Sequence, residues 1–246
     1  YGITASGLAC CAVLVTLVRP RAIETTAQMR SLRSLFAGLS FVYSTRMLLA
    51  AITLDLFAVL FGGATMLMPI FAKNILEIGP IGLGALRAAP ALGSLFTAIW
   101  IAHRPPFRKP GIALLASIAA FGVATIGFGL STNVFLSFAM LFLTGAFDNI
   151  SVVVRGTLMQ VLTPDSMRGR VAAVNAVFIS SSNELGAFRA GMVTHGLDQV
   201  LSSVVLATVL SVVGGGVATI LVVLAAHLVW PDLRHLPPLH SLKPAP

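Results

Sequence analysis

The sequence predicts an all-α membrane protein with about seven transmembrane helices. Of its 246 residues, 57% are hydrophobic and only 10% are charged, whereas soluble globular domains carry roughly 25% charged residues. The mean hydropathy is +0.95, so most of the surface must face lipid. The apolar residues are also grouped in runs near or above the ~20 residues that span a bilayer.

Seven apolar stretches carry this prediction. Each is expected to be helical, because in lipid the backbone polar groups must be satisfied within their own segment. The stretches are residues 1–18, 47–72, 81–102, 111–130, 134–162, 171–197 and 200–229. The sixth stretch is the most polar, and the orientation described below requires it to span. Together the last six predict a six-helix bundle over residues 47–230.

The longest connection, residues 19–46, is basic and partly amphipathic. Its arginines are Arg19, Arg21, Arg30, Arg33 and Arg46. Apolar residues recur at helical spacing, at Leu32, Leu35, Phe36, Leu39 and Val42. This spacing favours an amphipathic helix along the membrane face, and a disordered linker is the alternative.

Basic residues orient the predicted helices. Lysines and arginines gather in residues 19–46, 103–110, 163–170 and the tail 231–246, whereas the opposite loops hold only Lys73. Cytoplasmic loops of membrane proteins are enriched in these residues. We therefore expect all four basic segments to be cytoplasmic.

Several other protein classes fit the sequence poorly. The net charge of +8 is spread between apolar runs rather than gathered in one basic patch, so no nucleic-acid partner is expected. Cys10 and Cys11 are adjacent and cannot form a disulfide framework or a zinc site. Catalytic motifs and metal-ligand spacing are missing, so neither an enzyme nor a cofactor is expected.

Ionisable residues inside the predicted spans are costly, which makes them candidate functional residues. These residues are Asp55, Arg87, Asp148, Arg155, Glu184 and Arg189. Asp148 and Arg155 lie two turns apart on one helical face and could line one cavity at different depths. We expect one or more of the acids to bind and release a proton, whereas fixed interhelical ion pairs are the alternative. Arg87 and Arg155 are also candidates to hold an anionic substrate.

The sixth stretch adds polar candidates. Asn175, Ser182, Asn183 and Gly186 are spaced to share one helical face, which we expect to point toward a cavity. Hydroxyl groups and glycine also permit close helix packing, which is the alternative interpretation.

Particular segments resemble a known family. They are Asp148 to Arg155, Thr163 to Val171, Asn175, Ser182 to Gly186, Leu54 to Phe57 and Leu86 to Pro90. They resemble the bacterial drug and siderophore exporter branch of the major facilitator superfamily. The stretch from Asp148 to Gly186 is the most specific. Arg189 departs from the pattern, because the family has an acidic residue there.

The resemblance implies that residues 1–18 are the end of helix six and that the other stretches are helices seven to twelve of a twelve-helix fold. Residues 19–46 would join the two halves, and Asp165, Arg168 and Arg170 would belong to a cytoplasmic gating loop. The expected N-terminal six-helix half would then be missing from this chain, which begins inside an apolar run at Tyr1.

The implied function is export of small organic compounds across the bacterial cytoplasmic membrane. Such transporters place the substrate site between two helical bundles and work by alternating access. We expect proton antiport as the driving force, with the bilayer, protons, a small-molecule substrate and the N-terminal half as partners. The alternative is a truncated, non-transporting half or a membrane scaffold protein.

Overall fold

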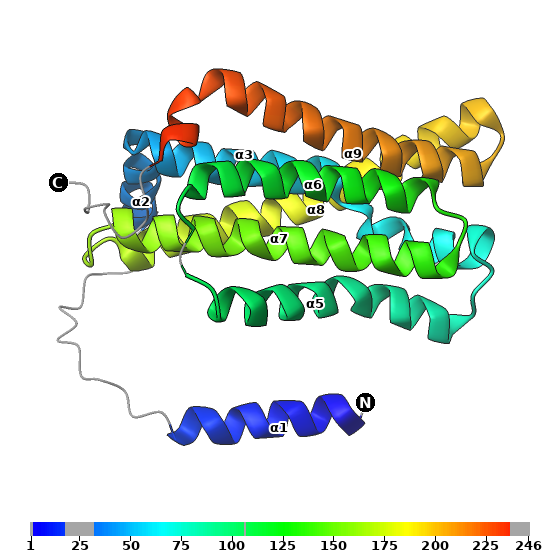
Figure 1. Cartoon of the computed structure of the whole chain (residues 1–246), viewed down its shortest axis with the longest axis horizontal. Helices are drawn as coiled ribbons and strands as arrows, with labels where there is room; N and C mark the ends of the chain where they lie inside the picture. The colour runs from blue at the N-terminus through cyan, green and yellow to red at the C-terminus, as the bar shows by residue number, and fades with distance from the viewer. Residues whose placement is uncertain (1, 18–31, 106, 237–246) are drawn as a thin grey trace. The chain divides into compact units, whose positions relative to one another are not determined.

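The computed structural model describes residues 2–17, 32–105 and 107–236, and over these residues the secondary structure is entirely helical (Figure 1). The predicted all-α class is confirmed. Arg19, Arg21, Arg30 and the tail from residue 237, which were predicted to be cytoplasmic, lie outside the described residues. The chain divides into two compact units, residues 1–34 and 35–246.

The first unit contains α1 (Gly2–Leu17). Two hydroxyl groups bond back to the preceding turn, from Ser6 to the Gly2 carbonyl and from Thr16 to the Val13 carbonyl. Cys10 and Cys11 are free and exposed. Helix α2 (Leu32–Ser44) begins at the end of this unit and continues into the second.

Within the second unit, α2 turns sharply into α3 (Arg46–Gly62). Residues 36–44 of α2 make an angle of 104° with α3. The side chain of Val42 is buried against Ile52, Val171 and Val174, while Phe36 is 67% exposed. Helix α2 is therefore a separate amphipathic element that packs one face against the bundle.

The stretch 47–72, which was predicted as one helix, is interrupted in the structure. Helix α3 stops at Gly62, and Gly63 separates it from a short 3-10 turn, η1 (Ala64–Leu67). A single helical turn, α4 (Met68–Ile70), and a π-helical turn, η2 (Phe71–Ile75), follow. Adjacent glycines weaken a helix, and Pro69 lacks the N–H that would continue it.

Five further helical elements complete the chain. They are α5 (Pro80–Ala102), α6 (Pro110–Leu130), α7 (Val134–Leu162), α8 (Arg168–Leu201) and α9 (Val204–Val229), followed by the 3-10 turn η3 (Pro231–His235). Side chains define some of the ends. The Asn133 side chain accepts hydrogen bonds from the backbone N–H groups of Phe135 and Leu136, which is a typical N-cap.

Four described helices, α5, α6, α7 and α9, are long and apolar enough to cross a membrane by themselves, and the bent pair α2–α3 counts as a fifth candidate. The prediction was about seven spans. Helix α8 is long enough, but it carries the polar run from Ser180 to Glu184, and α1 has 16 described residues. Both differences follow from composition and length.

The helices of the second unit pack side by side as a bundle (Figure 1). Helix α7 lies between α5 and α6, while α9 contacts α6, α3 and α8. Two apolar clusters lie at opposite ends of the bundle. Leu48, Leu114 and Leu158 belong to one cluster, and Phe71 and Phe128 to the other.

Candidate functional site

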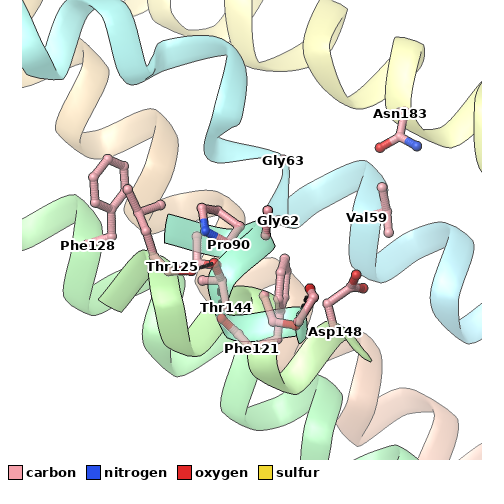
Figure 2. Close-up of a pocket in the computed structure, with 14 residues that line it drawn as sticks. Val59, Gly62, Gly63, Pro90, Phe121, Thr125, Phe128, Thr144, Asp148 and Asn183 are labelled. Atoms are coloured by element: carbon pink, nitrogen blue, oxygen red, sulfur yellow. Dashed lines mark hydrogen bonds between the residues drawn. The ribbon is translucent and has the colours of Figure 1, made fainter. Parts of the chain in front are cut away.

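A cavity of about 240 Å³ lies where α3, α5, α6, α7 and α8 approach one another (Figure 2). Its apolar walls include Phe121, Phe128 and Leu141, and Asp148 is the charged residue among the described residues that line it. The remaining polar side chains of the lining are Ser94, Thr125, Thr144 and Asn183. The cavity therefore combines aromatic walls, hydroxyl groups and a single carboxylate.

Close contact between α5 and α7 shapes one wall. The Ser94 hydroxyl donates to the Gly145 carbonyl at 2.9 Å. A Cβ atom added to Gly145 would lie 2.6 Å from Pro90 Cα, so only glycine permits this approach of the two backbones. Pro90 lacks a backbone N–H, so it leaves no unpaired hydrogen-bond donor in this wall. Gly62 and Gly63 at the end of α3 also line the cavity.

Next to the cavity, α3 and α7 are joined by a buried ion pair between Asp55 and Arg155. The exposed fractions of the two residues are 5% and 4%. The Ser151 hydroxyl donates to Asp55 Oδ1 at 3.3 Å. These charges compensate each other, as a buried pair must. For Asp55 and Arg155 the structure thus has the interhelical ion pair that sequence reasoning held as an alternative.

A second, very small cavity is lined by both Asp55 and Asp148. Its volume is about 10 Å³, and its lining includes Asp55, Ser151 and Asp148. That volume is close to the minimum needed for one water molecule. Both aspartates therefore border one small space together with Ser151, which already bonds to Asp55.

The other predicted residues are distributed unevenly. Asn183 lines the main cavity and donates through Nδ2 to the Ile179 carbonyl at 3.0 Å. Glu184 and Arg87 are exposed, and neither lines the cavity. The structure thus gathers Asp55, Asp148, Arg155 and Asn183, and their roles remain predictions.

Asn175 lies elsewhere, in a cavity of about 590 Å³ between the end of α7 and the start of α8. Thr163 and Arg168 also line this space. In the predicted gating loop, Arg168 pairs with Asp165 at 2.9 Å, and both side chains are largely exposed. Arg170 donates to the sulfur atom of Met167 at 3.3 Å.

Sequence reasoning missed three features of this region. Ser151 was not singled out, although it lies on the same helical face as Asp148 and Arg155 and could have been found by spacing. Phe121 and Phe128 belong to a helix without charged residues and gave no signal. Arg189 was noted as a departure from the family pattern, but its partners, the carbonyls of Leu60 and Phe61, were not foreseen.

Together the helical bundle, the interrupted helix beside a cavity and the buried charges define a class. The fold is that of half of a major facilitator superfamily protein, and several described helices are long and apolar enough to cross a membrane. Discontinuous helices next to the substrate site are a recurring feature of membrane transporters.

Comparison with known proteins specifies this class further. No family model matches the chain. The enterobactin exporter EntS of Escherichia coli strain K12 is 27% identical over 237 residues, which cover 96% of this chain and 54% of that protein. The enterobactin exporter of Shigella dysenteriae serotype 1 matches over the same lengths with the same identity. The chain is homologous to these exporters, and it spans about half of their length.

A solved structure supports the fold. It is a bacterial homologue of the human lysosomal transporter Spinster, in an inward-facing and unoccupied conformation. The match has a TM-score of 0.56 and 14% identity, and it covers 94% of this chain and 57% of that one. The predicted resemblance to the major facilitator superfamily and its siderophore-exporter branch is confirmed by these two comparisons.

Proposed function

We propose that this chain is the C-terminal half of a proton-coupled exporter of small organic compounds, and that the cavity at Asp148 forms part of its substrate site. The homology to enterobactin exporters over about half of their length supports the class. The observation that carries the proposal is the environment of Asp148, the single carboxylate in the described lining of the cavity.

Asp148 is the carboxylate best suited to exchange a proton. Asp55 already has a compensating charge in Arg155, whereas no cation of the described chain pairs with Asp148. An uncompensated charge in an apolar environment is costly. Binding of a proton removes that cost, and so does a positively charged or hydrogen-bond-donating group of a substrate. The proton and the substrate would therefore compete for Asp148. This competition would couple proton entry to substrate release.

The neighbouring ion pair has a different role in this proposal. Asp55 and Arg155 hold α3 against α7 and keep their charges, while Ser151 bonds to Asp55 and lines the same small cavity as Asp148. If the contact between Ser151 and Asp55 rearranges when Asp148 changes charge, α3 and α7 can shift relative to each other. Protonation would thereby bias the bundle between two states, as alternating access requires.

The topology follows from the basic segments. We place the loops 103–110 and 163–170, the connection 19–46 and the tail on the cytoplasmic side, where the Asp165–Arg168 pair would contact the N-terminal half in one of the two states. The other bundle would supply the opposite wall of the substrate site.

The test replaces Asp148 by Asn in the complete transporter, with both halves present, reconstituted in liposomes. The probes are ethidium, a fluorescent organic cation, and enterobactin, which the relatives are named for. We expect Asp148→Asn to abolish proton-driven transport of whichever probe the wild type moves, while the thermal stability of the protein is retained. Asp198→Asn, a matched change outside the site on α8, should transport normally. Wild-type rates in Asp148→Asn would refute the role of this residue.

A further inference from the structure

The end of α3 presents carbonyl groups inside the bundle that lack partners within the helix. Because α3 stops at Gly62 and the chain continues as a 3-10 turn, its last carbonyl oxygens have no helical N–H partners. Those carbonyls form the negative end of the helix dipole. A partly buried helix end of this kind requires hydrogen-bond donors, and a cationic donor suits it best.

Arg189 on α8 supplies the donors. Its Nε donates to the Leu60 carbonyl at 3.0 Å, and one terminal nitrogen donates to the Phe61 carbonyl at 2.7 Å. The guanidinium carbon also lies 5.8 Å from the centroid of the Phe61 ring. The rigid fork of donors on arginine can reach two adjacent carbonyls at once, which a lysine ammonium group on its flexible stem matches poorly.

The surrounding helices are shaped to fit this contact. A Cβ atom added to Gly186 on α8 would lie 3.1 Å from the Leu60 oxygen, and one added to Gly215 on α9 would lie 3.1 Å from the Arg189 guanidinium. The Thr219 hydroxyl of α9 contacts the Ala58 carbonyl at 3.3 Å. Two helices therefore converge on the end of α3 with glycines, a hydroxyl group and a guanidinium.

We propose that the carbonyl end of α3 is a guanidinium-binding site which Arg189 occupies, and that Arg189 thereby positions the cavity wall formed by Gly62 and Gly63. The two glycines follow Phe61 directly and line the main cavity. Arg189 itself does not line that cavity, so it acts on the site through the backbone of α3. Its effect on transport rests on the proposed function, whereas the guanidinium site does not.

The site is tested by chemical rescue of the purified chain in detergent. Arg189→Ala should lower the melting temperature by roughly 6 to 24 °C, because it removes two hydrogen bonds from a charged donor. Millimolar guanidinium chloride should restore part of this loss in a saturable manner, whereas equal concentrations of sodium chloride or urea should not. Arg108→Ala removes an exposed arginine. This control should change neither the melting temperature nor its response to guanidinium chloride. An Arg189→Ala melting temperature equal to that of the wild type, or no specific rescue, would overturn the proposal.

A second variant keeps the site testable if Arg189→Ala does not fold. Arg189→Lys retains the charge but lacks the forked donors, so its melting temperature should lie measurably below that of the wild type. Equal stability of the Lys variant would contradict a site built for a guanidinium.

The positioning role is tested separately, in the complete transporter. Arg189→Ala should raise the KM for the transported probe, and added guanidinium should lower it again. A purely structural role would reduce the amount of active protein and leave the KM unchanged, and that result would overturn the positioning role. If the wild type transports no probe, the proposed function fails while the rescue of stability still decides the guanidinium site.

Discussion

The contact between α5 and α7 at Gly145 allows a quantitative prediction. A Cβ atom at this position would lie 2.6 Å from Pro90 Cα and even closer to the Pro90 carbonyl oxygen. Since non-bonded carbon atoms pack about 3.5 to 4.0 Å apart, Gly145→Ala must push the two helices apart by about 1 Å. A gap of that size forfeits roughly a quarter to a half of the dispersion energy across the interface.

The expected cost has two parts. Overpacking costs about 1 to 3 kcal/mol, and stretching the Ser94–Gly145 hydrogen bond removes about 0.5 to 1.5 kcal/mol more. We therefore expect Gly145→Ala to lose about 1.5 to 4.5 kcal/mol of unfolding free energy. Because Gly145 and Pro90 both line the cavity, substrate binding should weaken as well.

The assay is reversible unfolding of the purified chain in detergent micelles. Gly156→Ala is the matched control, because it lies on the same helix and a Cβ atom there meets nothing within 4 Å. That variant should be unchanged or gain up to about 1 kcal/mol from helix propensity. Equal stability of the two variants would refute the predicted contact between α5 and α7.

Three further predictions concern charge, capping and topology. Arg155→Leu should lower the unfolding free energy by about 3 to 5 kcal/mol, because it leaves Asp55 buried without a partner. Adding Asp55→Asn should recover part of this loss. An Arg155→Leu variant as stable as the wild type in the same unfolding assay would contradict the prediction. Asn133→Ala should destabilise α7 by about 1 kcal/mol through loss of its N-cap, whereas Asn133→Asp should not, and equal loss in both would exclude capping as the cause. After Cys10 and Cys11 are replaced by serine, a cysteine at Gln199 should react with a membrane-impermeant reagent from outside and one at Ser166 from inside; the reverse pattern would refute the orientation.

Sequence alone predicted the class of the fold, because composition and the length of apolar runs decide whether a chain faces lipid. It did not predict the interruption at Gly63, since adjacent glycines are tolerated in many transmembrane helices. The polarity of α8 raised the question of whether it spans, and its contacts with α3 and α9 explain how a helix carrying Ser182 and Asn183 is accommodated in the bundle.

The candidate site was predictable only in part. Ionisable residues in apolar runs identified Asp55, Asp148 and Arg155, because charges are rare in such runs. Their partners depend on the register and rotation of α3 against α7, which local patterns do not contain. For the same reason the carbonyl partners of Arg189 were not predicted. They belong to the end of α3, which the sequence had placed ten residues later, at residue 72. The aromatic walls at Phe121 and Phe128 are likewise properties of packing.

Flux in reconstituted liposomes tests the central claim most directly. The complete transporter is measured with and without an imposed pH gradient, using ethidium and enterobactin as probes. Proton-coupled export predicts that the gradient drives accumulation of a transported probe, that dissipation of the gradient by a protonophore abolishes this accumulation, and that Asp148→Asn removes the dependence on the gradient. Accumulation that is indifferent to the gradient, or a gradient dependence preserved in Asp148→Asn, would contradict it.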